Sequence, residues 1–204
     1  MPSERGFARD EDGAALIEAA LILPVLLMLV FALADLSLYF WQASLTRKAA
    51  DLGARLAVVS DAVAEGPGLT YSESESYWFG LPPGLRCRPA PGAAASCPAF
   101  AVRCSGRGGC TCEEGRCGFR YSTAKLRPIL AAMRAVLPAL APENVEITYA
   151  TNGLGYVGRP PPVPVDVTVR VVGFRYEAIF LGLLFADAIP LSAAATLPGE
   201  DLSR

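Results

Sequence analysis

The sequence predicts an α+β protein, in which a long amino-terminal membrane-spanning helix continues into a periplasmic domain with a second helix, a small antiparallel sheet and a disulfide-rich loop region. Three observations predict this class. An apolar run long enough to cross a bilayer lies near the amino terminus, and the six cysteines of the chain lie close together. After residue 144 the spacing of apolar residues changes from three and four to two.

The amino-terminal helix is predicted from residues 14–40, in which Glu18 and Asp35 are the only charged side chains. A bilayer requires about 20 predominantly apolar residues, and this run supplies them. Pro24 predicts a kink, because proline removes one backbone hydrogen bond. Beyond the run, apolar residues keep a helical spacing, which extends the predicted helix to about Ala64: Leu45, Ala49, Leu52, Leu56 and Val59.

Small residues share one face of the second half of this helix, namely Ala50, Gly53, Ala54 and Ala57. Small side chains at this spacing allow another element to approach closely. The alternative is a helix that is rich in alanine only for its helix propensity. Gly53 favours a packing face, because a glycine inside a helix costs about 1 kcal/mol.

Residues 65–122 are predicted to be irregular, because they are rich in glycine and proline and lack clear periodicity. All the cysteines lie here: Cys87, Cys97, Cys104, Cys110, Cys112 and Cys117. An even number of clustered cysteines favours disulfides and an oxidising compartment, although the sequence does not choose among the pairings. The alternative is a zinc site built from the last four, whose spacing lacks the paired C-x2-C pattern of such sites.

The remaining elements follow in order along the chain. A second helix begins after Ser122 or Thr123 as N-cap, and its apolar face ends before Pro138 and Pro142. Period-two alternation then predicts strands around residues 145–149 and 163–171. The apolar residues 179–188 are too few to cross a bilayer and predict a loop-helix insertion before a last strand at residues 189–197.

The most specific pattern is the passage from Asp12 to Glu18. Gly13 ends a leader with two basic and four acidic side chains, and four apolar residues separate it from Glu18. A carboxylate inside a membrane span costs about 2.5–3.5 kcal/mol on insertion scales, so its presence there indicates a specific function. Pilin-type proteins, which this passage resembles, have such a function for it, because their leader is cut after the glycine. The resemblance implies cleavage between Gly13 and Ala14, which brings the new ammonium group of Ala14 within reach of Glu18.

A competing processing site is Ala32-Leu33-Ala34, which has the A-x-A form that signal peptidase cleaves. Cleavage there would release residues 35–204. The acidic leader and Glu18 both argue against this alternative, because a signal peptide has a basic leader and an uninterrupted apolar run.

Composition and motifs argue against several functions. The chain has no histidine, which removes most hydrolytic triads and the usual zinc-enzyme sites, and a net charge of −2 without a basic block argues against nucleic acid as a partner. Gly153 to Gly158 spell G-x-G-x-x-G, but prolines follow instead of the helix that a dinucleotide site requires, which predicts a hairpin loop. No catalytic residue, cofactor or metal is predicted.

From Asp12 to Val59 the chain resembles the TadE-like family, pilin-like (pseudopilin) minor subunits of tight-adherence, or Flp, pili. The resemblance rests on three segments: residues 13–18, residues 20–24 with the early proline, and residues 47–55 with their small residues and arginine. The Cys-rich residues 85–118 are not typical of the family and are expected to be an insertion.

The resemblance implies three regions: a leader at 1–13, a transmembrane and extended helix at 14–64, and a periplasmic domain at 65–204. It implies cleavage by a prepilin peptidase between Gly13 and Ala14, with Glu18 setting the register between subunits. The implied partners are the bilayer of the bacterial inner membrane, other pilin-like subunits and the pilus assembly platform.

Two functions from different classes therefore remain open. The first is a structural subunit for pilus assembly and tight adherence, and the second is a membrane-anchored or secreted disulfide-rich binding or adhesion module. Two signals predict opposite orientations of the domain. Arg47, Lys48 and Arg55 follow the span, so the positive-inside rule predicts a cytoplasmic domain. The clustered cysteines favour the periplasm.

Overall fold

A computed structural model describes residues 11–70, 77–88, 92, 97–115, 118–159, 163–180, 182, 188–199 and 202. The chain divides into two compact units. One contains residues 1–41 and 176–189, and the other contains residues 42–175 and 190–204. The predicted α+β class is confirmed by the helices, antiparallel strands and disulfides described below.

The first element is a single helix, α1 (Glu11–Ala57), which has 47 residues and continues through Pro24. At about 1.5 Å per residue its length is about 70 Å. It ends at Ala57 rather than near Ala64, because the residues that follow enter a sheet. Ala64–Glu65 forms β1, which pairs with β4 (Arg120–Tyr121).

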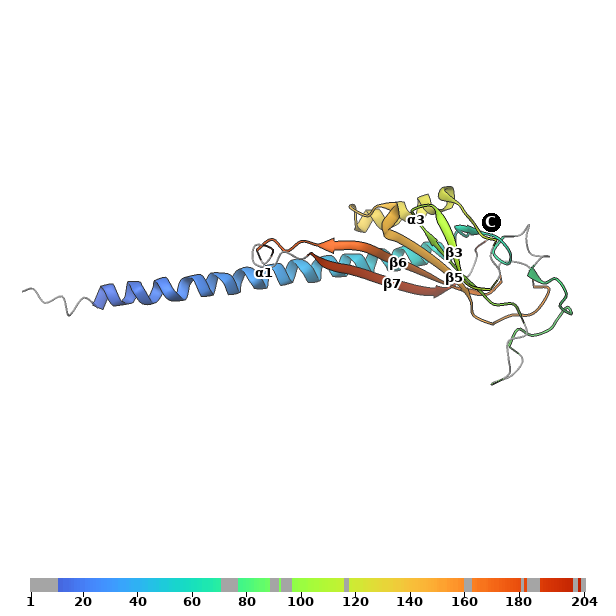
Figure 1. The fold of residues 1–204 in the computed structure, drawn as a ribbon, viewed down its shortest axis with the longest axis horizontal. Coiled ribbons are helices and arrows are strands. Elements are labelled where there is room, and N and C mark those ends of the chain that lie inside the picture. Colours follow the sequence, from blue (N-terminus) through green and yellow to red (C-terminus); the bar gives the residue numbers. More distant parts are fainter. Residues whose placement is uncertain are drawn as a thin grey trace, which may run out of the picture. The chain divides into compact units, whose positions relative to one another are not determined.

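The main sheet has five strands in the order β3-β2-β5-β6-β7 (Figure 1). Three strands lie where the sequence predicts them: β5 (Val145–Thr151) and β6 (Val165–Tyr176), from period-two alternation, and β7 (Ile189–Pro198), the predicted last strand. β5 pairs with β6 in antiparallel register, so the glycine-rich residues 153–158 form a hairpin loop as predicted. Gly153 and Gly155 in this loop have φ values of +71° and +93°, which favour glycine.

The other two strands, β2 (Phe100–Ser105) and β3 (Gly109–Gly115), lie inside the segment predicted to be irregular. They form an antiparallel hairpin, and β2 also pairs with β5. Part of the Cys-rich segment is therefore sheet. Residues 1–10, most of the predicted insertion at 179–188, and Cys117 lie outside the described residues.

The second predicted helix is α3 (Thr123–Val136), with Ser122 at the N-cap position but without a capping hydrogen bond from its side chain. Its buried face is the predicted one: Leu126, Ile129, Leu130 and Met133. The helix ends before Pro138, and a short 3-10 turn, η2 (Pro142–Asn144), leads into β5.

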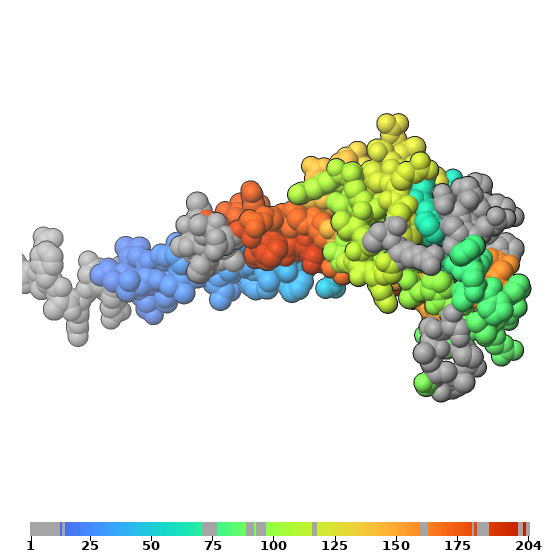
Figure 2. All heavy atoms as spheres, turned by 45° about the vertical axis from the view of Figure 1, so that its right-hand side comes forward, coloured from blue at the N-terminus to red at the C-terminus, as the bar shows by residue number. Residues whose placement is uncertain are grey.

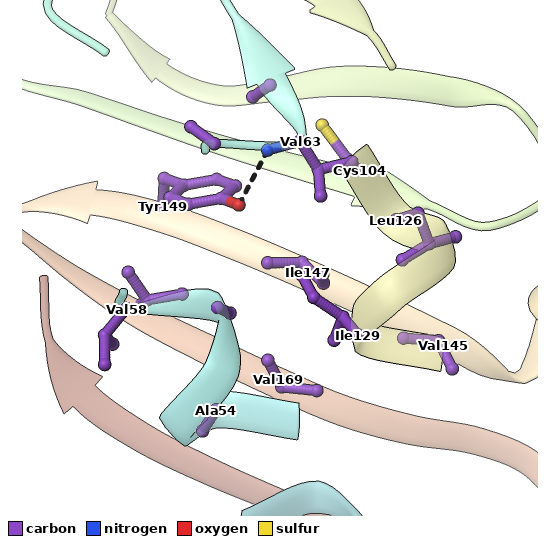
Figure 3. Close-up of a cluster of buried hydrophobic side chains, with 14 of the residues drawn as sticks. Ala54, Val58, Val63, Cys104, Leu126, Ile129, Val145, Ile147, Tyr149 and Val169 are labelled. Carbon is purple, nitrogen blue, oxygen red and sulfur yellow. Dashed lines mark hydrogen bonds between the residues drawn. The ribbon is translucent and has the colours of Figure 1, made fainter. Parts of the chain in front are cut away.

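The core lies between one face of the sheet and the two helices (Figure 3). Alternate residues of β5 and β6, including Ile147, Tyr149 and Val169, are at most 1% exposed. Ala50, Ala54 and Ala57 of α1 are fully buried, which confirms that the small residues form a packing face. The element that they approach belongs to the same chain, because a Cβ added to Gly53 would lie 2.7 Å from Met133 Sδ and 3.0 Å from Val169 Cγ1.

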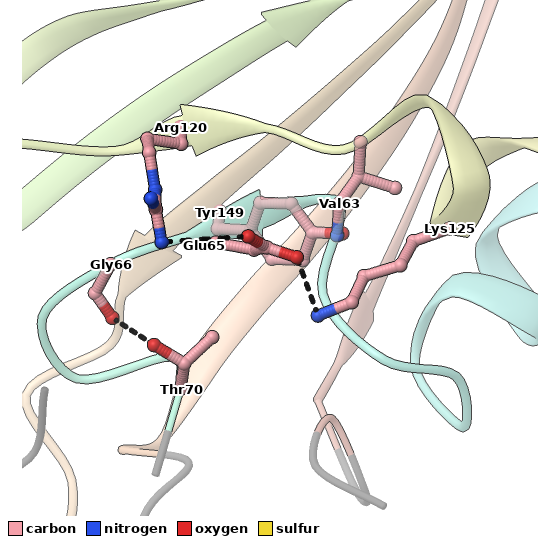
Figure 4. Close-up of polar contacts among 7 residues, drawn as sticks. All are labelled: Val63, Glu65, Gly66, Thr70, Arg120, Lys125 and Tyr149. Carbon is pink, nitrogen blue, oxygen red and sulfur yellow. Dashed lines mark hydrogen bonds and ion pairs between the residues drawn. The ribbon is translucent and has the colours of Figure 1, made fainter. Parts of the chain in front are cut away.

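Polar contacts hold the chain where it leaves α1 and enters β1 (Figure 4). The Val63 N–H donates to the Tyr149 hydroxyl oxygen at 2.9 Å. Glu65 forms ion pairs with Lys125 at 3.1 Å and Arg120 at 4.0 Å, and the Thr70 hydroxyl donates to the Gly66 carbonyl at 3.2 Å. These contacts connect the end of α1 to α3, β4 and β5.

Candidate membrane-anchoring and assembly helix

The amino-terminal part of α1, drawn in blue in Figure 2, has exposed apolar side chains. Leu16, Leu21 and Val25 are 73%, 71% and 67% exposed. Among the described residues, α1 from Ala15 to Ala57 is long and apolar enough to cross a membrane, and its most apolar stretch is not buried within the chain. Apolar side chains that remain exposed along several helical turns match a helix that lies in lipid.

The predicted processing residues lie at the start of this helix. Gly13 and Ala14 belong to its first turn, and Glu18 follows one turn later with an exposed side chain. Glu18 lies four positions after Ala14 in the sequence, about one helical turn further along α1. Within the described part of the chain, no hydrogen bond or ion pair involves the Glu18 carboxylate.

The second charge of the apolar run, Asp35, has a different environment, since it is only 1% exposed. Its carboxylate oxygens accept hydrogen bonds from the backbone N–H of Ile179 at 3.0 Å and of Phe180 at 2.8 Å. Its backbone carbonyl accepts a hydrogen bond from the Tyr176 hydroxyl at 3.0 Å. The Asp35 side chain thus binds the segment that follows β6.

Aromatic contacts flank Asp35 at a spacing of four residues along α1. The Phe31 ring stacks on Phe180 with centroids 4.3 Å apart, and the Tyr39 ring meets Tyr176 edge to face at 5.7 Å. Phe31, Asp35 and Tyr39 therefore form one stripe that binds residues 176–180. This stripe was not predicted from the sequence. Two features of the sequence indicate it: the i, i+4, i+8 spacing of its residues and the aromatic residues in segment 174–180.

The disulfides lie in the other unit. Cys87 is bonded to Cys97, and Cys104 is bonded to Cys110 across the β2–β3 hairpin. Cys112 is also disulfide-bonded. Because Cys104 and Cys110 are bonded to each other, they do not supply thiolates for the alternative zinc site. In the described ranges, no group of three or more His, Cys, Asp or Glu side chains is arranged to hold a metal.

A cavity of about 410 Å³ lies next to the Cys87–Cys97 disulfide. Its lining includes Tyr77, Trp78, Arg88 and Asp166. The polar groups there bind one another: Arg88 donates to the Asn152 carbonyl at 3.3 Å, and the Asn152 amide donates to Asp166 Oδ1 at 3.2 Å.

Comparison with known families supports the resemblance seen in the sequence. Residues 13–55 match the family described as TadE-like protein. No curated protein and no solved structure matches the chain. The matched residues begin at the predicted cleavage glycine and lie entirely within α1, so the similarity covers the helix and not the sheet. The chain is therefore similar to TadE-like proteins along α1, and among the described residues α1 is the helix that is long and apolar enough to cross a membrane.

Proposed function

We propose that the protein is a pilin-like structural subunit (a pseudopilin) for assembly of a tight-adherence pilus, cleaved by a prepilin peptidase between Gly13 and Ala14. The observation that carries this proposal is the coincidence of the TadE-like match with α1, whose first half exposes apolar side chains. Glu18 then becomes the fifth residue of the mature chain.

The chemistry of Glu18 supports an assembly role. A carboxylate and a free ammonium group attract each other far more strongly in lipid than in water, so the pair removes much of the cost of burying each charge. If the Ala14 ammonium belongs to a neighbouring subunit, the pair sets the register between two helices, which is a well-attested use of a buried polar contact.

The partners follow from this role. The leader is residues 1–13, and the peptidase, the inner-membrane bilayer, other pilin-like subunits and the assembly platform meet the chain through α1. The sheet domain, with its disulfides, lies in the periplasm and enters the pilus with the helix. Glu18, Gly13 and Ala14 are the residues on which this function depends.

Two substitutions in the native host test the proposal. Glu18→Ala should leave cleavage intact and strongly reduce the number of pili, because the carboxylate acts after processing. Asp51→Ala is the matched control, since Asp51 lies on the same helix but is exposed and paired with Arg55 at 3.2 Å. Wild-type piliation in the Glu18→Ala strain would contradict the proposal.

Intact mass of the membrane-extracted protein tests the cleavage itself. We expect a chain that starts at Ala14, and we expect Gly13→Ala to accumulate the uncut form while Gly6→Ala, in the same leader, is processed normally. A chain that starts at Met1 or Asp35 would contradict processing at Gly13.

The second candidate function is a membrane-anchored or secreted disulfide-rich binding module, and the cavity beside Cys87–Cys97 favours it. Its secreted form requires cleavage after Ala34, in the middle of α1 and next to the buried Asp35. A helix must unwind to be cleaved there, so the anchored form is the stronger version of this alternative. Normal piliation without the protein, together with loss of adhesion, would favour it over the first proposal.

A further inference from the structure

The start of the segment after β6 is held on α1 by hydrogen bonds from two of its backbone N–H groups. Both carboxylate oxygens of Asp35 accept backbone N–H groups, from Ile179 and Phe180. An N–H group that leaves water without a hydrogen-bond partner destabilises the structure. Here these two donors are paired with a charged acceptor, which also disperses the charge of Asp35.

The aromatic stripe shows how far along α1 this segment reaches. Phe180 stacks on Phe31, one helical turn before Asp35 and about 6 Å further toward the amino terminus along the axis. Phe31 belongs to the exposed apolar stretch of α1, and its neighbour Leu33 is 55% exposed. A bilayer that covers this stretch therefore also reaches Phe180.

Tyrosine and tryptophan side chains mark the expected edge of the bilayer. The rings of Tyr39 and Tyr176 contact each other, and Trp41, two residues after Tyr39 in α1, is 67% exposed. These two residue types concentrate at the headgroup level of membranes, because their rings are apolar and their polar atoms require partners. Asp35, Ile179 and Phe180 lie on the amino-terminal side of this level, toward the hydrocarbon.

We propose that Ile179 and Phe180 form a second lipid contact of the protein, inserted into the outer edge of the bilayer beside α1, with Asp35 as the positioning residue that holds them. Ile179 is 61% exposed, which leaves its side chain free for lipid. Residues 179–186 carry no charged side chain in the sequence. The proposal rests on the membrane anchoring of α1 in the proposed function.

Tryptophan fluorescence of the full chain in vesicles of brominated phosphatidylcholine tests the proposal. The two native tryptophans are replaced (Trp41→Phe, Trp78→Phe), and Ile179→Trp supplies the reporter. Leu26→Trp in the same background reports on the span, and a variant that retains Trp78 reports on the sheet domain. Bromine atoms quench only tryptophans that contact lipid, and acrylamide quenches those that contact water.

We expect brominated lipid to quench the Leu26→Trp and Ile179→Trp reporters but not Trp78. Quenching of the span reporter alone would overturn the lipid contact while leaving membrane anchoring in place. An Ile179→Trp reporter that neither reagent quenches is covered by protein, which would also overturn it. Absence of quenching for both inserted reporters would overturn the anchoring, and the lipid contact with it.

The role of Asp35 is tested in the same background. Asp35→Ala removes both acceptors, so we expect the Ile179→Trp reporter to lose lipid quenching and gain acrylamide quenching, whereas Leu26→Trp is unchanged. Asp35→Asn keeps one acceptor oxygen and should give an intermediate loss, which guards against misfolding of the alanine variant. Asp51→Ala is the matched control and should have no effect; unchanged quenching in both Asp35 variants would overturn the positioning role.

Discussion

Tyr149 joins two distant parts of the chain through one hydroxyl group. It is fully buried in β5, and its hydroxyl oxygen accepts the N–H of Val63, which lies between α1 and β1. Burial raises the pKa of Tyr149 well above its usual value of 10.0, and burial also raises the pKa of Tyr77 to about 12. Both side chains therefore remain neutral in the folded protein throughout the physiological range.

Removing this hydroxyl should destabilise the protein. Tyr149→Phe leaves the buried Val63 N–H without a partner, for which we expect a loss of about 1–3 kcal/mol in the free energy of unfolding. Urea unfolding of the detergent-solubilised full chain measures it. Tyr156→Phe is the control, because Tyr156 is 49% exposed and should change stability little; equal losses in both variants would contradict the role of the bond.

The same side chain gives a pH dependence at the alkaline end. Because the folded pKa of Tyr149 is raised above the unfolded value of 10.0, its contribution is fully present below pH 10 and is lost as pH rises further. The slope is about 1.4 kcal/mol per pH unit for one such group. In Tyr149→Phe the slope above pH 10 should be smaller, and an unchanged slope would contradict the assignment.

At the scale of elements, the close contact of α1 with α3 and β6 depends on a missing side chain. Gly53 lies against Met133 and Val169, at distances that leave no room for a Cβ. Large residues there would force the helix away from the sheet, and the buried alanines on either side have the same function. The small-residue face is therefore used within the subunit.

Gly53→Ala tests this packing. At an exposed helix position the change would stabilise the protein by about 1 kcal/mol through helix propensity. Here overpacking, typically about 1–3 kcal/mol, should outweigh that gain and lower the unfolding free energy. Adding Met133→Ala should make the two effects non-additive, because it provides space for the new methyl group; a more stable Gly53→Ala would contradict the tight contact.

The β2–β3 hairpin lies in the segment that was predicted to be irregular. Phe100, Val102 and Cys104 are buried and alternate with the half-buried Ala101, Arg103 and Ser105, so burial has period two once Cys104 is counted as apolar. The glycines and arginines around it obscured this pattern. The register places Cys104 directly opposite Cys110, which explains why these two cysteines are bonded.

At the scale of the whole molecule, two signals disagree on which side of the membrane the sheet domain lies. Arg47 and Lys48 follow the span and favour the cytoplasm, whereas Arg55 forms an ion pair with Asp51. The disulfides favour an oxidising compartment. We expect the sheet domain to lie in the periplasm, as the disulfides favour, because charge near the span biases the orientation without determining it.

Protease treatment of spheroplasts measures this orientation. We expect added protease to degrade the sheet domain in intact spheroplasts, and alkylation of the non-reduced protein to find no free thiol. A cytoplasmic protein of the same host, which must remain intact, controls for lysis. Protection of the domain until lysis would contradict the periplasmic location.

The sequence by itself determined the elements whose signals are local: the apolar helix, α3, and the alternating strands β5 and β6. These follow from the periodicity of neighbouring residues, which each segment carries independently. The tertiary structure alone decided the contacts between residues far apart in the chain: Asp35 with Ile179 and Phe180, Tyr149 with Val63, and the pairing of β2 with β5. Such contacts depend on how the whole chain buries its apolar surface and satisfies its polar groups, which no single segment encodes.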